Sequence, residues 1–232
     1  IKECETFRKR LAFDELLANF LVFNKLKKEN NKEKNTYIVN DFANSENIIK
    51  GLSFKLTKDQ INAYKEIKED IASNQKMYRL LQGDVGSGKT IISLLIIADF
   101  VKAGYQCVVM VPTEILAKQH YDYFCDLLPD MVEEISLLTG KSKNKKEIYK
   151  KVSGNKIKIL IGTHAVYNKD INFKNLGLII IDEQHKFGVK QRMNLAKKGG
   201  VDCDILLMSA TPIPRTMMLA VYGDMEISKI TE

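Results

Sequence analysis

The chain has 232 residues, of which 45% are hydrophobic and 28% are charged, and its formal net charge is +7. This composition excludes an intrinsically disordered chain and fits one globular domain, with or without an appendage. The positive charge is compatible with an anionic partner but does not require one.

Membrane, secreted and zinc-binding classes are not favoured. No apolar run approaches 18 residues, and the N-terminus lacks the charged-then-apolar pattern of a signal peptide. The four cysteines are scattered without a C-x-x-C pair, and the three histidines lie at no metal-ligand spacing. We therefore expect a cytoplasmic protein with reduced thiols. Because the chain begins abruptly and without Met, we expect it to be a piece of a longer protein.

The first 50 residues are expected to form an N-terminal helical linker, and residues 51–232 the main domain. Apolar residues at roughly helical spacing predict an amphipathic helix over about 5–27. The lysine-rich segment 27–35 is a solvated helix end and loop, or a nucleic-acid tail. Residues 40–50 carry no clear signal and are interpreted as a connector.

The main domain is predicted to be α/β, with a mostly parallel sheet flanked by helices. Its short Ile/Val/Leu runs are continuous rather than alternating, which is typical of strands covered on both faces. Strands are predicted at 78–81, 107–111, 135–138, 157–161, 178–181 and 205–208. Helices are predicted at 90–101, 114–128, 144–152, 189–198 and 214–221. This βαβ order predicts a doubly wound sheet.

A phosphate-binding loop follows the first of these strands. The eight residues fit G-x-x-x-x-G-K-[ST], whose backbone N–H groups and following helix N-terminus surround a polyphosphate. They are Gly83, Asp84, Val85, Gly86, Ser87, Gly88, Lys89 and Thr90. In this pattern Lys89 reaches the β- and γ-phosphates and the Thr90 hydroxyl reaches Mg²⁺. The chain is therefore predicted to bind a nucleoside triphosphate.

Two carboxylates end a second apolar strand. Asp182 and Glu183 follow the run at 178–181, at the strand edge where such sheets bind ligands. Asp182 is suited to hold Mg²⁺, directly or through water, and Glu183 to orient and deprotonate an attacking water. An acidic first turn of a solvated helix is the alternative, and the phosphate loop favours hydrolysis over it.

Two hydroxyl residues follow a third apolar strand. Ser209 and Thr211 are placed to sense the nucleotide, although a plain helix N-cap before Pro212 explains them equally well. The residues themselves leave this choice open.

Taken in order, these motifs resemble the first motor lobe of superfamily 2 helicases, a RecA-like fold. Residues 54–60 look like the adenine-reading motif with Gln60 as the reader, and the three motifs above look like its catalytic motifs. The resemblance also includes residues 112–117, 182–189 and 210–216. Within the superfamily, these segments are similar to bacterial helicases that remodel stalled replication forks. Residues 10–17 look like the helix that joins a DNA-wedge domain to the motor in those helicases.

The resemblance implies roles for residues that chemistry alone does not assign. By it, the DNA path would be lined by Thr113, Thr139, Gly140, Gly162, Thr163 and His164. Gln184, His185, Ser209 and Thr211 would relay the nucleotide state to the DNA. His120 lies in a predicted helix and is interpreted as a satisfied histidine of the core or surface. Small and hydroxyl residues after strands can donate to phosphates, which positions DNA without reading its sequence.

Two departures from the family pattern are visible, and two rival functions stay open. Lys186 stands where the family mostly has Arg, and Ser53 replaces a usual Pro; Lys lacks the bidentate fork of Arg. A nucleotide-gated binding module and an RNA-remodelling motor are the rivals. An intact Glu183 argues against the first, and Gln184-His185, in place of Ala-Asp, against the second.

The resemblance implies an ATP-dependent DNA helicase that uses ATP and Mg²⁺. Its expected substrates are double-stranded and branched DNA, which it would remodel by fork regression and junction branch migration. In this family a second motor lobe supplies arginines to the site, so we expect this chain to bind nucleotide weakly and hydrolyse little unaided.

Overall fold

The computed structural model describes residues 39–183, 203–211 and 225–231, together with residues 7, 10–14 and 17 near the N-terminus. Those last residues are helical and lie within the helix predicted over 5–27. The rest of that helix, the predicted helices 189–198 and 214–221, and the coupling residues Gln184 and His185 lie outside the described residues.

The described strands form one seven-stranded sheet with every neighbouring pair parallel. The strand order is β3-β4-β2-β5-β6-β1-β7. The strands are β1 (Tyr78–Gly83), β2 (Gln106–Met110), β3 (Ile135–Leu138), β4 (Ile159–Gly162), β5 (Leu176–Ile181), β6 (Asp204–Ser209) and β7 (Glu226–Ile230). The predicted parallel α/β sheet is confirmed, with β7 as an edge strand that the sequence did not predict.

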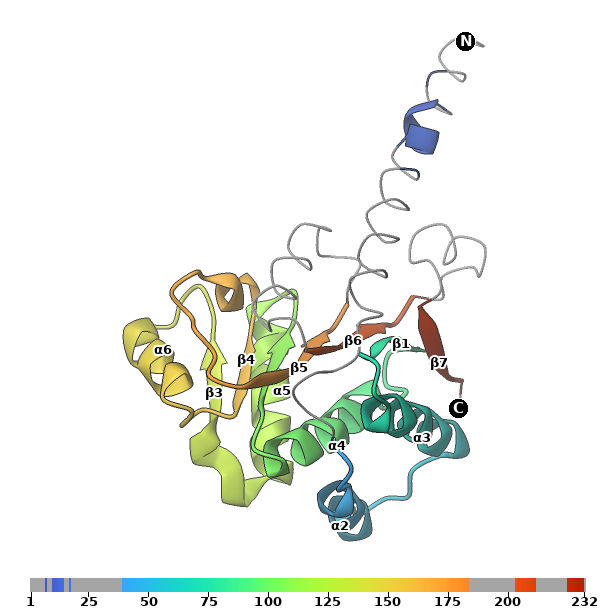
Figure 1. The fold of residues 1–232 in the computed structure, drawn as a ribbon, viewed down its shortest axis with the longest axis horizontal. Helices are drawn as coiled ribbons and strands as arrows, with labels where there is room; N and C mark the ends of the chain where they lie inside the picture. Colours follow the sequence, from blue (N-terminus) through green and yellow to red (C-terminus); the bar gives the residue numbers. More distant parts are fainter. Residues whose placement is uncertain are drawn as a thin grey trace.

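Helices cover both faces of the sheet (Figure 1). In chain order the helices are α2 (Ala43–Gly51), α3 (Lys58–Ala72), α4 (Lys89–Lys102), α5 (Glu114–Leu127) and α6 (Lys145–Ser153), with 3-10 turns η1 (Pro129–Glu134) and η2 (His164–Tyr167). One buried cluster joins the sheet to α3, α4 and α5, and a second joins its other face to α6 and η2.

The central strands place alternate side chains in the two clusters. Val109 and Ile180 belong to the α3–α5 side, whereas Val108 and Ile179, their neighbours in the chain, belong to the α6 side. All four are fully buried. Because both faces are covered, apolar residues suit most positions of these strands, which explains the continuous Ile/Val/Leu runs.

Residues 43–51 form helix α2, so the connector interpretation of this segment is wrong. The helix packs against α4: Asn44 Nδ2 donates to the carbonyl O of Ala98 at 3.1 Å, and Ser45 N donates to Asp99 Oδ1 at 2.9 Å. With three apolar residues among nine, α2 carries little local signal. Its stability comes from tertiary packing.

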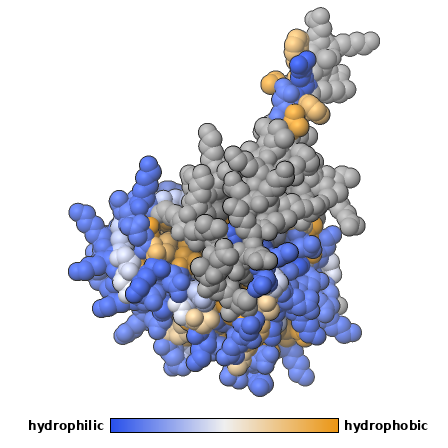
Figure 2. Space-filling model, in the orientation of Figure 1, coloured by the Kyte–Doolittle hydropathy of each residue, from blue (hydrophilic) through white to orange (hydrophobic). Residues whose placement is uncertain are grey.

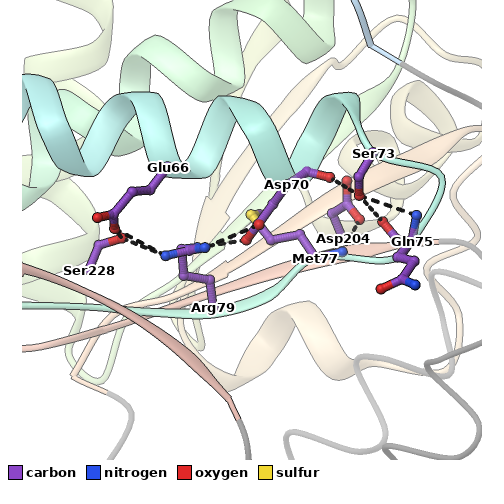
Figure 3. A network of polar contacts seen from close by, with 8 residues as sticks. All are labelled: Glu66, Asp70, Ser73, Gln75, Met77, Arg79, Asp204 and Ser228. Carbon is purple, nitrogen blue, oxygen red and sulfur yellow. Dashed lines mark hydrogen bonds and ion pairs between the residues drawn. The ribbon is translucent and has the colours of Figure 1, made fainter.

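A network of polar side chains ties α3 to β1 and β7; we call it the Arg79 network (Glu66, Asp70, Arg79 and Ser228; Figure 3). Arg79 Nε lies 2.6 Å from Asp70 Oδ2, Arg79 Nη1 lies 3.1 Å from Glu66 Oε2, and Arg79 Nη1 lies 2.9 Å from Ser228 Oγ. The guanidinium is buried, and its carboxylate partners raise its pKa against the opposing effect of burial. The network thus fixes the edge strand β7 to the lobe.

The surface of the lobe is largely hydrophilic on the face drawn in Figure 2. Within the described parts of the chain, none of the helices has the length and apolar character needed to cross a membrane.

Candidate nucleotide and DNA sites

The phosphate loop lies between the carboxyl end of β1 and the N-terminus of α4, as predicted. Gly86 and Gly88 have φ values of +85° and +86°, in the left-handed region that favours glycine. A Cβ on Gly88 would collide with Gln60 Nε2, and one on Gly83 would lie 2.9 Å from the carbonyl O of Ile230. Thus Gly83 is needed for a close contact with backbone, and Gly88 is favoured by its positive φ, besides any approach of a phosphate.

Lys89 begins α4, and its ammonium group turns back onto the loop. Its Nζ donates to the carbonyl oxygens of Gly83 at 2.5 Å and Asp84 at 2.8 Å. Burial lowers the pKa of Lys89, while the charges of Asp182, Glu183 and Asp84 oppose that shift. Carbonyl groups are weaker partners for a cation than phosphate oxygens. The ammonium group is therefore held in a position from which a polyphosphate can attract it.

Gln60 lies directly beside the loop. It is at the third position of α3, where it completes a capping box with Thr57. Its Nε2 donates to the carbonyl O of Ser87 at 2.8 Å. The side chain expected to read adenine thus touches the phosphate loop itself.

Asp182 and Glu183 follow β5 at the same edge of the sheet. Asp182 is buried, and its backbone N donates to the carbonyl O of Met110 in β2 at 2.8 Å. Glu183 N donates to Asp182 Oδ1 at 2.9 Å. Glu183 has φ = +49°, which is uncommon for a residue with a Cβ and is frequent at functional positions. The two carboxylates therefore leave the strand in a constrained turn.

A histidine from another element completes the surroundings of Asp182. His120, in α5, is buried, and its Nε2 lies 3.2 Å from Asp182 Oδ2. It is a core histidine, as interpreted, but only its Nε2 has a partner; its buried Nδ1 has none among the described residues. No local pattern indicated Asp182 as that partner, since 62 residues separate the two. Only the neighbouring positions of β2 and β5 bring α5 to Asp182.

Ser209 and Thr211 follow β6, next to the phosphate loop. Ser209 Oγ lies 3.0 Å from Thr211 Oγ1, and Gln82 Nε2, at the end of β1, donates to the carbonyl O of Thr211 at 2.9 Å. Gln82 was not among the predicted site residues. It links the segment after β6 to the strand that carries the phosphate loop.

The residues expected to line the DNA path lie after three neighbouring strands. Thr113 follows β2 and caps α5, accepting from Leu116 N at 3.2 Å. Thr139 and Gly140 follow β3, whereas Gly162 ends β4 and is followed by Thr163 and His164. Because β3, β4 and β2 are consecutive in the sheet, these segments share one edge.

The predicted DNA contacts differ in exposure. His164 is exposed, whereas Thr139 and Thr163 are largely buried. A Cβ on Gly162 would collide with the carbonyl O of Leu138, so that glycine is required for strand pairing. Backbone groups and exposed side chains, rather than every hydroxyl, are therefore available to a phosphate at this edge.

An ion pair links two of these segments. Lys141 Nζ lies 3.0 Å from Glu114 Oε2, which joins the segment after β3 to the start of α5. Hydrogen bonding by Lys141 lowers the pKa of the Glu114 carboxyl group.

This edge of the sheet offers oxygen ligands for Mg²⁺ but, among the described residues, no complete set of protein ligands. Among the described residues, no cluster of three or more His, Cys, Asp or Glu side chains could hold a metal. A protein hydroxyl and one carboxylate, such as Thr90 and Asp182, suit Mg²⁺ because it keeps several waters and binds substrate phosphates. The donor set therefore fits a nucleotide-bound Mg²⁺.

Comparison with protein families identifies the chain. The DEAD/DEAH box helicase model matches residues 57–219. The chain belongs to the DEAD/DEAH box helicase family. This match includes both the phosphate loop and the Asp182-Glu183 turn.

Within this helicase family the chain is similar to RecG proteins, as its motifs predicted. It is 49% identical over 231 residues to the ATP-dependent DNA helicase RecG of Aquifex aeolicus and 46% identical over 230 residues to that of Thermotoga maritima. Each alignment covers 98% of this chain and 29% of the relative. The resemblance to RecG is confirmed.

The fold comparison agrees. The structure of RecG bound to a three-way DNA junction matches with a TM-score of 0.77 and 42% identity, covering 99% of this helicase chain and 31% of that one. The chain thus spans about three tenths of the length of the relatives it matches. The RecA-like lobe predicted from the resemblance is confirmed.

Proposed function

We propose that the chain is the first motor lobe of an ATP-dependent DNA helicase that remodels branched DNA. One observation carries this proposal: the carboxyl edge of the sheet divides into two adjoining halves. The ends of β1, β6 and β5, consecutive in the sheet, carry the phosphate loop, Ser209 and Asp182. The ends of β2, β4 and β3 carry the segments expected to contact DNA. Movement at one half can thereby reach the other through β2 and β5.

The nucleotide half offers candidate groups for binding phosphate, holding Mg²⁺ and activating water. Lys89 would exchange its two carbonyl partners for phosphate oxygens, and the loop N–H groups would surround the phosphates. Thr90 and Asp182 would hold Mg²⁺, which supplies charge neutralisation at the β- and γ-phosphates when bound. Glu183 would orient the attacking water and accept its proton.

The DNA half suits contacts to the sugar–phosphate backbone. Thr113, Gly140 and His164 lie at exposed turns after strands, and Lys141 adds a cation beside them. Such contacts hold a duplex without reading its bases. Similarity to RecG, one structure of which is bound to a three-way junction, supports branched DNA as the substrate. The remaining domains and the second lobe would supply branch recognition and complete the site. A cytoplasmic location fits this role.

ATP hydrolysis with different nucleic acids tests the proposal. The assay uses a full-length chimera in which this chain replaces the matching segment of the Aquifex aeolicus relative, and the chain alone serves as the reference. We expect strong stimulation by a DNA fork, weaker stimulation by linear duplex, and little hydrolysis by the chain alone. Preferential stimulation by structured RNA would replace DNA with RNA as the substrate, and binding of nucleotide without hydrolysis would favour a nucleotide-gated binding module.

A further inference from the structure

His120, from outside the predicted motifs, contacts the carboxylate of Asp182, a predicted catalytic residue. Its imidazole is 6% exposed, and Nε2 lies 3.2 Å from Asp182 Oδ2. The ring of Phe124, one turn further along α5, packs against it edge-on, with the ring centroids 6.1 Å apart. The imidazole is thus held between an apolar wall and the carboxylate.

The hydrogen-bond partners determine which ring nitrogen carries the proton. An ionised carboxylate only accepts hydrogen bonds, so Nε2 must be the donor. His120 Nδ1 is buried and has no hydrogen-bond partner among the described residues. An unpaired lone pair costs less in such a place than an unpaired N–H, so the surroundings suit a proton on Nε2 and a bare Nδ1. His120 therefore acts as a fixed donor to Asp182.

Both oxygens of Asp182 are consequently restrained. Oδ2 accepts from His120, and Oδ1 accepts from the backbone N of Glu183 at 2.9 Å. Two donors on opposite oxygens fix the rotation of the carboxylate, and each oxygen keeps a second lone pair for another partner. Without His120, one of these restraints is lost.

We propose that His120 is a positioning residue that holds the Asp182 carboxylate in the orientation that receives nucleotide-bound Mg²⁺. The inference rests on the proposed role of Asp182 in holding Mg²⁺. Donors that hydrogen-bond a metal-binding carboxylate typically change metal affinity or activity by about 10- to 100-fold when removed. His120 does not touch the nucleotide itself, so its effect passes through Asp182.

Magnesium dependence of nucleotide binding by the 232-residue chain tests the proposal. A fluorescent ATP analogue is titrated in EDTA and then at increasing Mg²⁺, and the Mg²⁺ concentration at half effect is compared among variants. We expect His120→Leu to bind the analogue normally in EDTA but to require about 10- to 100-fold more Mg²⁺. His120→Gln, whose amide can place a donor near the position of Nε2, should restore most of this loss. If His120→Leu does not fold, His120→Asn, whose amide is shorter, should show the loss instead.

Two controls separate a positioning role from other causes. Phe124→Leu removes packing beside the same ring without removing the donor, so it should lower the melting temperature and leave the Mg²⁺ requirement unchanged. Asp182→Asn should raise the Mg²⁺ requirement at least as much as His120→Leu. A folded His120→Leu with the Mg²⁺ requirement of the unmodified chain overturns the role of His120 alone. An unchanged requirement in Asp182→Asn overturns the magnesium role of Asp182, and that of His120 with it.

Discussion

Two buried cations ten positions apart, Arg79 and Lys89, have opposite surroundings. In the Arg79 network the guanidinium meets two carboxylates and a hydroxyl, and its pKa is raised. In the phosphate loop the ammonium group of Lys89 meets two backbone carbonyls, and burial lowers its pKa. A cation with carboxylate partners is part of the architecture, whereas one with neutral partners is available to an incoming anion. The charge of Arg79 thus stabilises the fold, whereas the charge of Lys89 is proposed to serve nucleotide binding.

The largest effect is expected at Glu183, on the reactive side of this comparison. Glu183→Gln removes the proton acceptor and should lower ATP hydrolysis by the chimera about 10²- to 10⁴-fold. Binding of the ATP analogue and the free energy of unfolding should stay near those of the unmodified protein, since the substitution keeps the shape. Steady-state hydrolysis and equilibrium binding check this, and normal turnover would disprove the assignment.

Arg79 tests the architectural side. Arg79→Met leaves the carboxylates of Glu66 and Asp70 without their cation and should lower the free energy of unfolding by roughly 2–4 kcal/mol. These carboxylates are partly exposed, which keeps the loss at the lower end of the range for buried pairs. Denaturant unfolding of the chain measures it. An unchanged denaturant midpoint would show that β7 is held by backbone pairing alone. Arg79 would then not differ from Lys89 in its contribution to stability.

Lys89 should show the reverse behaviour. Lys89→Met removes an ammonium group whose hydrogen bonds go to backbone carbonyls and whose burial opposes its charge, so the free energy of unfolding should change by about 0.5 kcal/mol or less. Nucleotide affinity should fall roughly 10- to 100-fold, the equivalent of one or two charge-assisted hydrogen bonds to phosphate. The two variants, Arg79→Met and Lys89→Met, are measured side by side by unfolding and by analogue binding. Equal losses of stability would contradict the distinction.

Asp99 extends the comparison to a buried carboxylate that accepts from Ser45 N. Burial raises the pKa of Asp99 from 3.8 to about 6, although its hydrogen bonds with Ser45 oppose the shift. Because the folded state binds this proton more tightly, the stabilisation is complete below about pH 4 and is lost as the pH rises through about 6. Asp99→Asn should remove that loss.

The expected gain of Asp99→Asn over the unmodified chain is about 1–3 kcal/mol above pH 7 and falls toward zero near pH 4. Unfolding by denaturant at pH 4, 5, 6 and 7.5 measures the difference. The exposed Asp126→Asn is the matched control and should differ by about 0.5 kcal/mol or less at every pH. A pH-independent difference for Asp99→Asn would show that its carboxylate stays ionised in the fold.

Much of the nucleotide half could be predicted from the sequence because its chemistry is local. The residues from Gly83 to Thr90 are contiguous, and the strand before them and helix after them have clear apolar patterns. Asp182 and Glu183 could be predicted in the same way, because they directly follow β5, a fully buried strand with a continuous apolar pattern. By contrast, α2 and β7 could not be predicted, because their sequences have mixed polarity. Helix α2 packs a single face on α4, and strand β7 pairs with β1 on one edge only.

By itself, the sequence determined six of the seven described strands, the motifs that follow them and the chemistry that these motifs support, because each depends on neighbours in the chain. Only the tertiary structure decided the strand order, and with it that the proposed nucleotide and DNA halves adjoin on one edge. It also decided that His120 meets Asp182 and that Gln82 meets Thr211. These contacts join residues far apart in the chain, and their distance depends on how the sheet packs, which no local pattern of side chains encodes.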